Sequence, residues 1–167
     1  MKIRGLRGSV FEDIINRTIE DYRIKKLALI QKIPTPIVPM KMDKEGHITR
    51  AFFDKKSTVD YIGVVQEIAV CFDAKECATK IFPLANIHKH QYEFMKEFED
   101  QGGISFIIIY YNNFQLSYYL SFKQLKEYWT NKKNIDFEDL DEKYIIDMKG
   151  KIRINILEKL QLDIDER

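Results

Sequence analysis

The sequence predicts an α/β fold in which one helix, three strands, a second helix and a fourth strand follow one another. Apolar residues recur at helical spacing over 10–22 and again over 87–100. Short runs rich in β-branched and aromatic residues lie between these segments, and the near-continuous apolar run at 104–111 is typical of a buried central strand. This order can bring a residue of the first helix and residues of two strands together at one edge of the sheet.

The first helix begins at a predicted capping box, in which Ser9 caps the helix and Glu12 stands three residues later. A short strand over 27–33 follows and stops at a proline-rich stretch. Residues 37–56 contain two extended arms around the polar tip 43–47, so we expect a two-armed stalk that projects from the core.

Two more strands are predicted over 59–65 and 68–75, joined by a tight turn. The second helix ends at a pair of glycines, and the central strand is followed by a strand over 115–120. Ser121 opens a third helix through a second capping box. Beyond this helix the pattern is weak, with an acidic stretch over 134–147 that predicts one helical turn or more.

Composition predicts one compact domain over residues 1–167, with the stalk as an insertion at about 37–56, because 167 residues with 45% hydrophobic content can form a core. The sequence has neither an apolar run of membrane length nor a secretory leader, so we expect a cytoplasmic protein that binds no membrane. In a reducing compartment Cys71 and Cys77 are expected to be free thiols, and they lack the histidine spacing of a zinc site.

The net charge of +1 is distributed unevenly. Residues 1–90 carry 16 basic and 11 acidic side chains, a balance of +5, whereas residues 91–167 carry −4. A surface that faces a polyanion such as nucleic acid is one interpretation. The other is that solvated lysines vary by chance, and charge alone leaves both open.

Asp60, Asp73 and Lys75 form the pattern with the clearest chemistry. Asp73 and Lys75 are two residues apart on a predicted strand, so their side chains leave the same face. Two carboxylates suit Mg²⁺, which prefers oxygen ligands, and the backbone carbonyl of Ala74 is a third candidate ligand. Lys75 would orient a water or stabilise developing charge. Such an arrangement would suit Mg²⁺-dependent phosphodiester hydrolysis, with Mn²⁺ as a substitute ion.

Each of these residues also has a purely structural interpretation, and the pattern alone favours that one. Asp73 and Lys75 would then be a surface ion pair on an edge strand, and Asp60 would cap a turn. Glu12 would serve only the capping box, although an acid at the start of an inward helix can also reach a metal through a water.

Several motifs considered together narrow these choices. They are Gly8 to Asn16, Lys32-Ile33-Pro34-Thr35-Pro36-Ile37, Ala51-Phe52-Phe53, Ser57-Thr58-Val59-Asp60-Tyr61-Ile62-Gly63, Phe72-Asp73-Ala74-Lys75-Glu76, Phe82-Pro83-Leu84, His90-Gln91 and Gly102 to Phe106. In combination they resemble the RecU family of Holliday junction resolvases over about residues 5–130.

The resemblance implies a restriction-endonuclease-like core, a mixed central sheet flanked by helices in the order αβββαβ, with a projecting stalk. It implies a homodimeric, Mg²⁺-dependent endonuclease that binds four-way DNA junctions and nicks two opposing strands symmetrically in recombination and repair. Recombinase or branch-migration proteins would be further partners. The residues implied as catalytic are Asp60, Asp73, Lys75, Glu12, Thr58 and Gln91, with metal ligands drawn from Asp60, Asp73, the Ala74 carbonyl and Glu12. The expected DNA contacts are Lys32, Lys41, Lys44, Arg50, Lys55 and Lys56.

Three features depart from the family pattern. Asp73 stands where the family usually has glutamate, the stalk is a few residues shorter, and the segment before Gly8 is brief. Two alternatives therefore remain beside junction resolution. One is a restriction- or repair-type endonuclease on duplex or flap DNA, and the other is a catalytically silent DNA-binding module that assists recombination.

Overall fold

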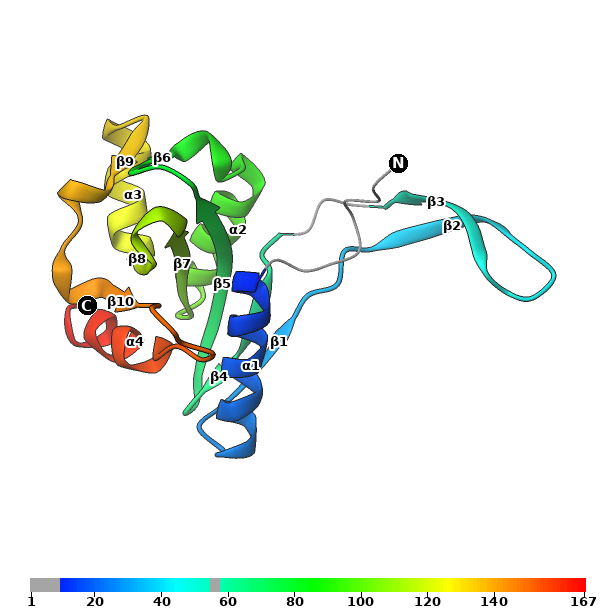
Figure 1. The fold of residues 1–167 in the computed structure, drawn as a ribbon, viewed down its shortest axis with the longest axis horizontal. Helices are drawn as coiled ribbons and strands as arrows, with labels where there is room; N and C mark the ends of the chain where they lie inside the picture. The colour runs from blue at the N-terminus through cyan, green and yellow to red at the C-terminus, as the bar shows by residue number, and fades with distance from the viewer. Residues whose placement is uncertain (1–9, 55–57) are drawn as a thin grey trace.

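A computed structural model describes residues 10–54 and 58–167 of the chain. Ser9 of the first predicted capping box, Ser57 and the predicted DNA contacts Lys55 and Lys56 lie outside the described residues. The described part is built on a six-stranded sheet with helices on both faces, from which a long hairpin projects (Figure 1). This agrees with the predicted α/β core and stalk.

The strands of the main sheet lie in the order β1-β4-β5-β7-β8-β10, and only β5 and β7 run parallel. In chain order its strands and the helices around it are α1 Val10–Ile24, β1 Ala28–Lys32, β4 Tyr61–Val65, β5 Ile68–Cys77, α2 Lys89–Asp100, β7 Ile104–Tyr111, β8 Leu116–Ser121, α3 Phe122–Asn131, β10 Ile145–Asp147 and α4 Ile156–Asp165. The predicted order of one helix, three strands, helix and strand is confirmed by α1, β1, β4, β5, α2 and β7.

Two helices cover each face of the sheet. Alternate residues of a strand face opposite sides, so Phe72 on β5 faces α1 whereas Asp73 faces α2. On the α1 face, α4 is joined to α1 through the Tyr22 hydroxyl, which accepts from the backbone N–H of Ile156 at 2.9 Å. On the other face, α2 and α3 meet through Tyr92 and Trp129, whose ring centroids are 4.4 Å apart.

A row of stacked aromatic rings crosses the sheet on the α1 face. Tyr61, Phe72, Phe106 and Tyr119 come from β4, β5, β7 and β8, with successive centroids 4.7, 4.8 and 4.4 Å apart. All four side chains are buried. Offset stacking of large rings adds to the free energy of burial, so the row fixes the spacing and register of four strands.

The hairpin at 37–53 extends away from the core (Figure 1). Its strands β2 Ile37–Met42 and β3 Ile48–Phe53 pair antiparallel, as the two predicted arms require. Irregular register follows Pro39, which has no backbone N–H to donate. The hairpin exposes apolar side chains, with Phe53 75% accessible. We name residues 37–53 the stalk.

The segments after residue 130 differ most from expectation. Over 134–147 the structure has the short strands β9 Asn134–Asp136 and β10 Ile145–Asp147, separated by two single turns of 3₁₀-helix. β9 pairs with β6 Ile81–Pro83, and β10 completes the edge of the main sheet. Three-residue strands are too short to show periodicity in sequence, which is why the acidic stretch predicted helical turns instead.

Two smaller predictions can also be compared with the structure. The helix expected over 87–100 begins at Lys89, because Ile87 and His88 have extended backbone and His88 caps the helix. Both cysteines are free thiols, as predicted, and both are buried. Among the residues that the structure describes, no helix has the length and apolar character needed to cross a membrane.

Candidate active site

Asp60 and Asp73 meet where β4 and β5 end their pairing. The Asp60 backbone N–H donates to Asp73 Oδ1 at 3.0 Å, and the Ala74 backbone N–H donates to Asp60 Oδ2 at 3.1 Å. The β4–β5 ladder runs from Val65 and Ile68 to Tyr61 and Phe72, so these two side chains continue it one step further. Asp60 and Asp73 are thirteen residues apart in sequence, but in the structure each carboxylate accepts a hydrogen bond from the backbone N–H of the opposite strand segment.

Lys75 and Gln91 complete the cluster on the α2 face. Lys75 Nζ lies 2.5 Å from Asp73 Oδ2, which confirms that the two side chains leave the same face of β5. Gln91 on α2 donates from Nε2 to Asp73 Oδ2 at 2.9 Å and accepts at Oε1 from Lys75 at 3.3 Å. The His88 backbone N–H also donates to Gln91 Oε1 at 3.1 Å, so the start of α2 fixes the amide orientation. Gln91 thus bridges the acid and the lysine.

The burial of the Asp73 carboxyl and the nearby Asp60 carboxylate make this a favourable place for a bound cation. Its side chain is 0% exposed, and this burial is the main cause that raises its pKa to about 7. Lys75 opposes the rise, whereas the neighbouring Asp60 carboxylate adds to it. A carboxylate that is costly to ionise beside a second one is stabilised by a bound divalent cation. The donor set of two carboxylates therefore fits Mg²⁺.

Glu12 lies in the first turn of α1 and forms an ion pair with Lys32, with Lys32 Nζ 2.5 Å from Glu12 Oε2. Lys32 is the last residue of β1 and pairs in register with Tyr61, the residue after Asp60. The first-helix acid and this predicted DNA contact therefore stand at the strand end that carries Asp60. Thr58 is half-buried two residues before Asp60, and its predicted supporting role stays a prediction.

The predicted DNA contacts of the stalk lie away from this cluster. Lys41 and Arg50 are exposed and face each other across the hairpin, and Lys44 is exposed at its tip. The tip also gathers three ligand-type side chains within 4.8 Å of one another, Asp43, Glu45 and His47. All three are exposed, and Asp43 already accepts backbone hydrogen bonds from Glu45 and His47. Exposed clusters of this kind occur without a metal, so we assign none here.

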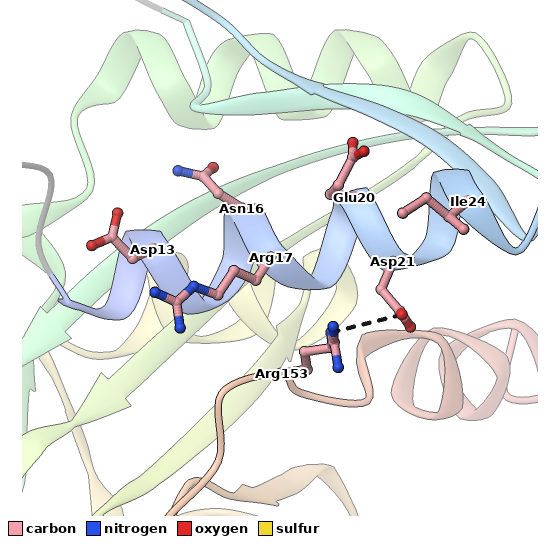
Figure 2. Close-up of a pocket in the computed structure, with 7 residues that line it drawn as sticks. All are labelled: Asp13, Asn16, Arg17, Glu20, Asp21, Ile24 and Arg153. Carbon is pink, nitrogen blue, oxygen red and sulfur yellow. Dashed lines mark ion pairs between the residues drawn. The ribbon is translucent and has the colours of Figure 1, made fainter.

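A surface groove of about 460 Å³ is lined by residues of α1 and by Arg153 (Figure 2). Its lining mixes acidic and basic side chains, including Asp13, Arg17 and Arg153, and Arg153 lies 3.7 Å from Asp21. Neither Asp60 nor Asp73 is among its lining residues, so we assign the groove no nuclease chemistry. One of its lining residues, Asn16, accepts a hydrogen bond from the hydroxyl of Tyr61, which directly follows Asp60.

A comparison with models of protein families shows to which family the chain belongs. The model of the RecU family, described as recombination protein U, matches residues 6–162. The chain belongs to the RecU family. The match extends beyond residue 130, where the sequence motifs are weak.

Relatives in bacteria carry the same family name. A Holliday junction resolvase RecU from Leuconostoc mesenteroides is 36% identical over 150 residues, which cover 85% of this chain and 74% of that protein. A Holliday junction resolvase RecU from Limosilactobacillus reuteri is 40% identical over 137 residues, or 79% of this chain and 67% of that protein. Among solved structures, Hjc, a Holliday junction resolvase from Archaeoglobus fulgidus, is a distant likeness, with 9% identity and a TM-score of 0.41 over 74% of this chain and 84% of that one.

The RecU chain described here also contains contacts that sequence reasoning missed. The crossed hydrogen bonds between Asp60 and Asp73 depend on the register of β4 and β5, which no motif encodes. The bond between Tyr61 and Asn16 had one available signal, since Asn16 follows Glu12 by one helical turn and shares its side of α1.

Proposed function

We propose that this RecU-family protein is a Holliday junction resolvase, an endonuclease that nicks two opposing strands of a four-way DNA junction in recombination and repair. The observation that carries the proposal is the cluster of Asp60, Asp73, Lys75 and Gln91. It combines two convergent carboxylates, a lysine and an orienting amide at one edge of a sheet.

We propose Mg²⁺ as the cofactor, with Mn²⁺ as a substitute. Asp60 and Asp73 would hold it, with the Ala74 carbonyl and Glu12 as further candidates. When bound, such an ion makes a water more nucleophilic and offsets charge at the phosphate and the leaving oxygen.

The side chains around this site have separate roles in the proposal. Lys75 supplies a fixed positive charge beside Asp73, where charge on the phosphate develops. Gln91 holds both groups in place from α2, so their geometry does not depend on two flexible side chains alone. Asp73 is buried below the surface of the site, whereas Asp60 is half-buried and stands closer to solvent and substrate.

The stalk supports a junction as the substrate. It projects from the core and carries Lys41, Lys44 and Arg50 in exposed positions, where they can contact phosphates inside a branched structure. Two symmetric nicks require two active sites, so a homodimer is part of the proposal. We propose that the protein works in the cytoplasm, where recombinase or branch-migration proteins would be further partners.

Cleavage of a synthetic four-way junction in Mg²⁺ tests the proposal with three proteins. They are the wild type, Asp73→Asn, and Asp100→Asn as a control on an exposed carboxylate of α2 that pairs with Lys96. Wild type and Asp100→Asn should cut. Asp73→Asn should bind the junction and not cut it, because the lost charge belongs to the site and contributes little to the grip on phosphates.

Three outcomes contradict the proposal in different ways. Equal cutting by Asp73→Asn removes the site assignment. Equal cutting of duplex, flap and junction by the wild type favours a restriction- or repair-type nuclease. Junction binding without cutting in either Mg²⁺ or Mn²⁺ favours a silent recombination module.

A further inference from the structure

We propose that Asn16 and Tyr61 form a positioning pair that sets where the first-helix carboxylate, Glu12, stands relative to Asp60 and Asp73. The inference rests on the proposed nuclease function and deepens it by assigning a role to two residues outside the carboxylate cluster. Neither residue would touch the substrate. Both would act through Glu12.

The strand side of the pair is rigid. Tyr61 is the first residue of β4 and directly follows Asp60 in the chain. Its side chain is 0% exposed, and its ring stacks on Phe72 at a centroid distance of 4.7 Å and an interplanar angle of 11°. Phe72 in turn precedes Asp73. Tyr61 and Phe72 are thus the direct chain neighbours of the two aspartates. Their stacked rings hold the Tyr61 hydroxyl in a fixed place relative to Asp60 and Asp73.

On the helix side of the pair, Asn16 is placed to influence the position of Glu12. The Tyr61 hydroxyl donates to Asn16 Oδ1 at 3.1 Å, and Asn16 is four residues after Glu12 on α1. One helical turn separates such residues, so they lie on the same side of the helix. Figure 2 shows the Asn16 side chain leaving α1 on the side opposite to Arg17.

The remaining contacts of α1 with the sheet are mostly apolar, through the buried side chains Phe11, Ile15 and Ile19. Apolar contact is not directional, so by itself it resists separation of the helix from the sheet more strongly than sliding or rotation. A hydrogen bond has a preferred distance and angle. The bond from Tyr61 to Asn16 thus fixes the helix along its axis and about it, and complements the ion pair of Glu12 with Lys32.

The electrostatic surroundings of the Tyr61 hydroxyl agree with this role. Burial raises the pKa of Tyr61 most, and the carboxylates of Glu12, Asp60, Asp13 and Asp73 raise it further. The hydroxyl thus lies within reach of charges from both the helix and the strands. It stays protonated at neutral pH and remains a hydrogen-bond donor to the Asn16 oxygen.

Tyr61→Phe is the test variant, because it keeps the stacked ring and removes only the hydroxyl. We expect the Mg²⁺ concentration for half-maximal junction cleavage to rise about fivefold, the factor expected for the net loss of one hydrogen bond. Calorimetric binding of Mn²⁺ to the DNA-free protein should weaken by a similar factor, and junction affinity should stay unchanged. Asn16→Ala should reproduce these changes, and Asn16→Asp, which keeps an acceptor oxygen, should restore much of the wild-type behaviour.

Tyr22→Phe is a matched control on the same helix. The Tyr22 hydroxyl is also buried, where it donates to Ile154 O at 3.0 Å and accepts from Ile156 N at 2.9 Å, but it joins α1 to the C-terminal segment. We expect Tyr22→Phe to lower the thermal unfolding temperature at least as much as Tyr61→Phe does, and to leave both metal measurements unchanged.

A double-mutant cycle with Glu12→Gln identifies the route of the effect. If the pair acts through Glu12, Tyr61→Phe adds little once Glu12 is neutral. Full additivity, or Mn²⁺ binding by Tyr61→Phe equal to that of the wild type, overturns the inference, as does an equal metal shift in Tyr22→Phe. If the wild type cuts no junction, the proposed function fails, while the Mn²⁺ measurements still decide whether the pair positions Glu12.

Discussion

The metal-free protein should lose stability as the pH rises through the titration of Asp73. Burial, with the Asp60 carboxylate beside it, raises the pKa of Asp73 from an ordinary 3.8 to about 7 despite the opposing charge of Lys75. Between these values the folded state holds a proton that the unfolded state has released. The stabilising contribution is thus fully present below pH 3.8 and is lost as the pH passes about 7.

The size of the effect follows from the same shift. Moving a pKa from 3.8 to about 7 corresponds to about 4 kcal/mol, which is an upper limit for the free energy of unfolding at stake. Asp73→Asn removes the titration. Its amide nitrogen must face donors on Lys75 and Gln91, but this cost does not depend on pH and cancels when the same variant is compared at two pH values. The difference in stability between wild type and variant should therefore change by about 2–4 kcal/mol from pH 4.5 to 8.5.

Urea unfolding in EDTA, followed by the fluorescence of the single tryptophan, Trp129, measures this difference. Asp100→Asn is the control and should give a pH profile parallel to that of the wild type. Added Mn²⁺ at pH 8.5 should stabilise the wild type and not Asp73→Asn, because the ion binds only the folded site. Parallel profiles for wild type and Asp73→Asn would refute the account of Asp73 as a buried, raised-pKa carboxyl.

Further predictions concern the bridge and the stalk. Gln91→Ala should lower the cleavage rate about 10- to 100-fold and leave junction affinity unchanged, because it removes the group that orients Asp73 and Lys75. Loss of junction binding would instead place Gln91 in the DNA interface. Arg50→Ala should weaken junction binding and reduce the slope of log affinity against log salt by about 1, and an unchanged slope would remove Arg50 from the phosphate contacts. Deletion of residues 40–50 should abolish the preference for junctions and leave weak nicking of duplex DNA, and a preserved preference would show that the stalk does not select the substrate.

Much of the fold was predictable because its elements carry local signals. The helical spacing of α1 and α2 and the apolar run of β7 each specify an element without reference to the rest of the chain. β10 and β9 were not predictable in this way, since each is three residues long and depends on a partner strand. The turn at Gln66 and Glu67 was expected, but its positive φ angles at two residues other than glycine follow from closing the β4–β5 hairpin.

The site shows the same division between local and long-range information. Asp73 and Lys75 share a strand, so their spacing alone predicts a common face, and the 2.5 Å contact confirms it. Gln91 was expected at the site through the family resemblance, and its contact with Asp73 needed the packing of α2 on β5. The ion pair of Glu12 with Lys32 joins a helix start to a strand end, which sequence spacing does not specify.

A crystal grown with Mn²⁺ tests the central claim most directly, through the anomalous signal of the ion. The account predicts a peak between the carboxylates of Asp60 and Asp73 in the wild type, and none there in Asp73→Asn. A peak confined to Asp43, Glu45 and His47 at the tip of the stalk, or no peak between the two aspartates at saturating Mn²⁺, would contradict it.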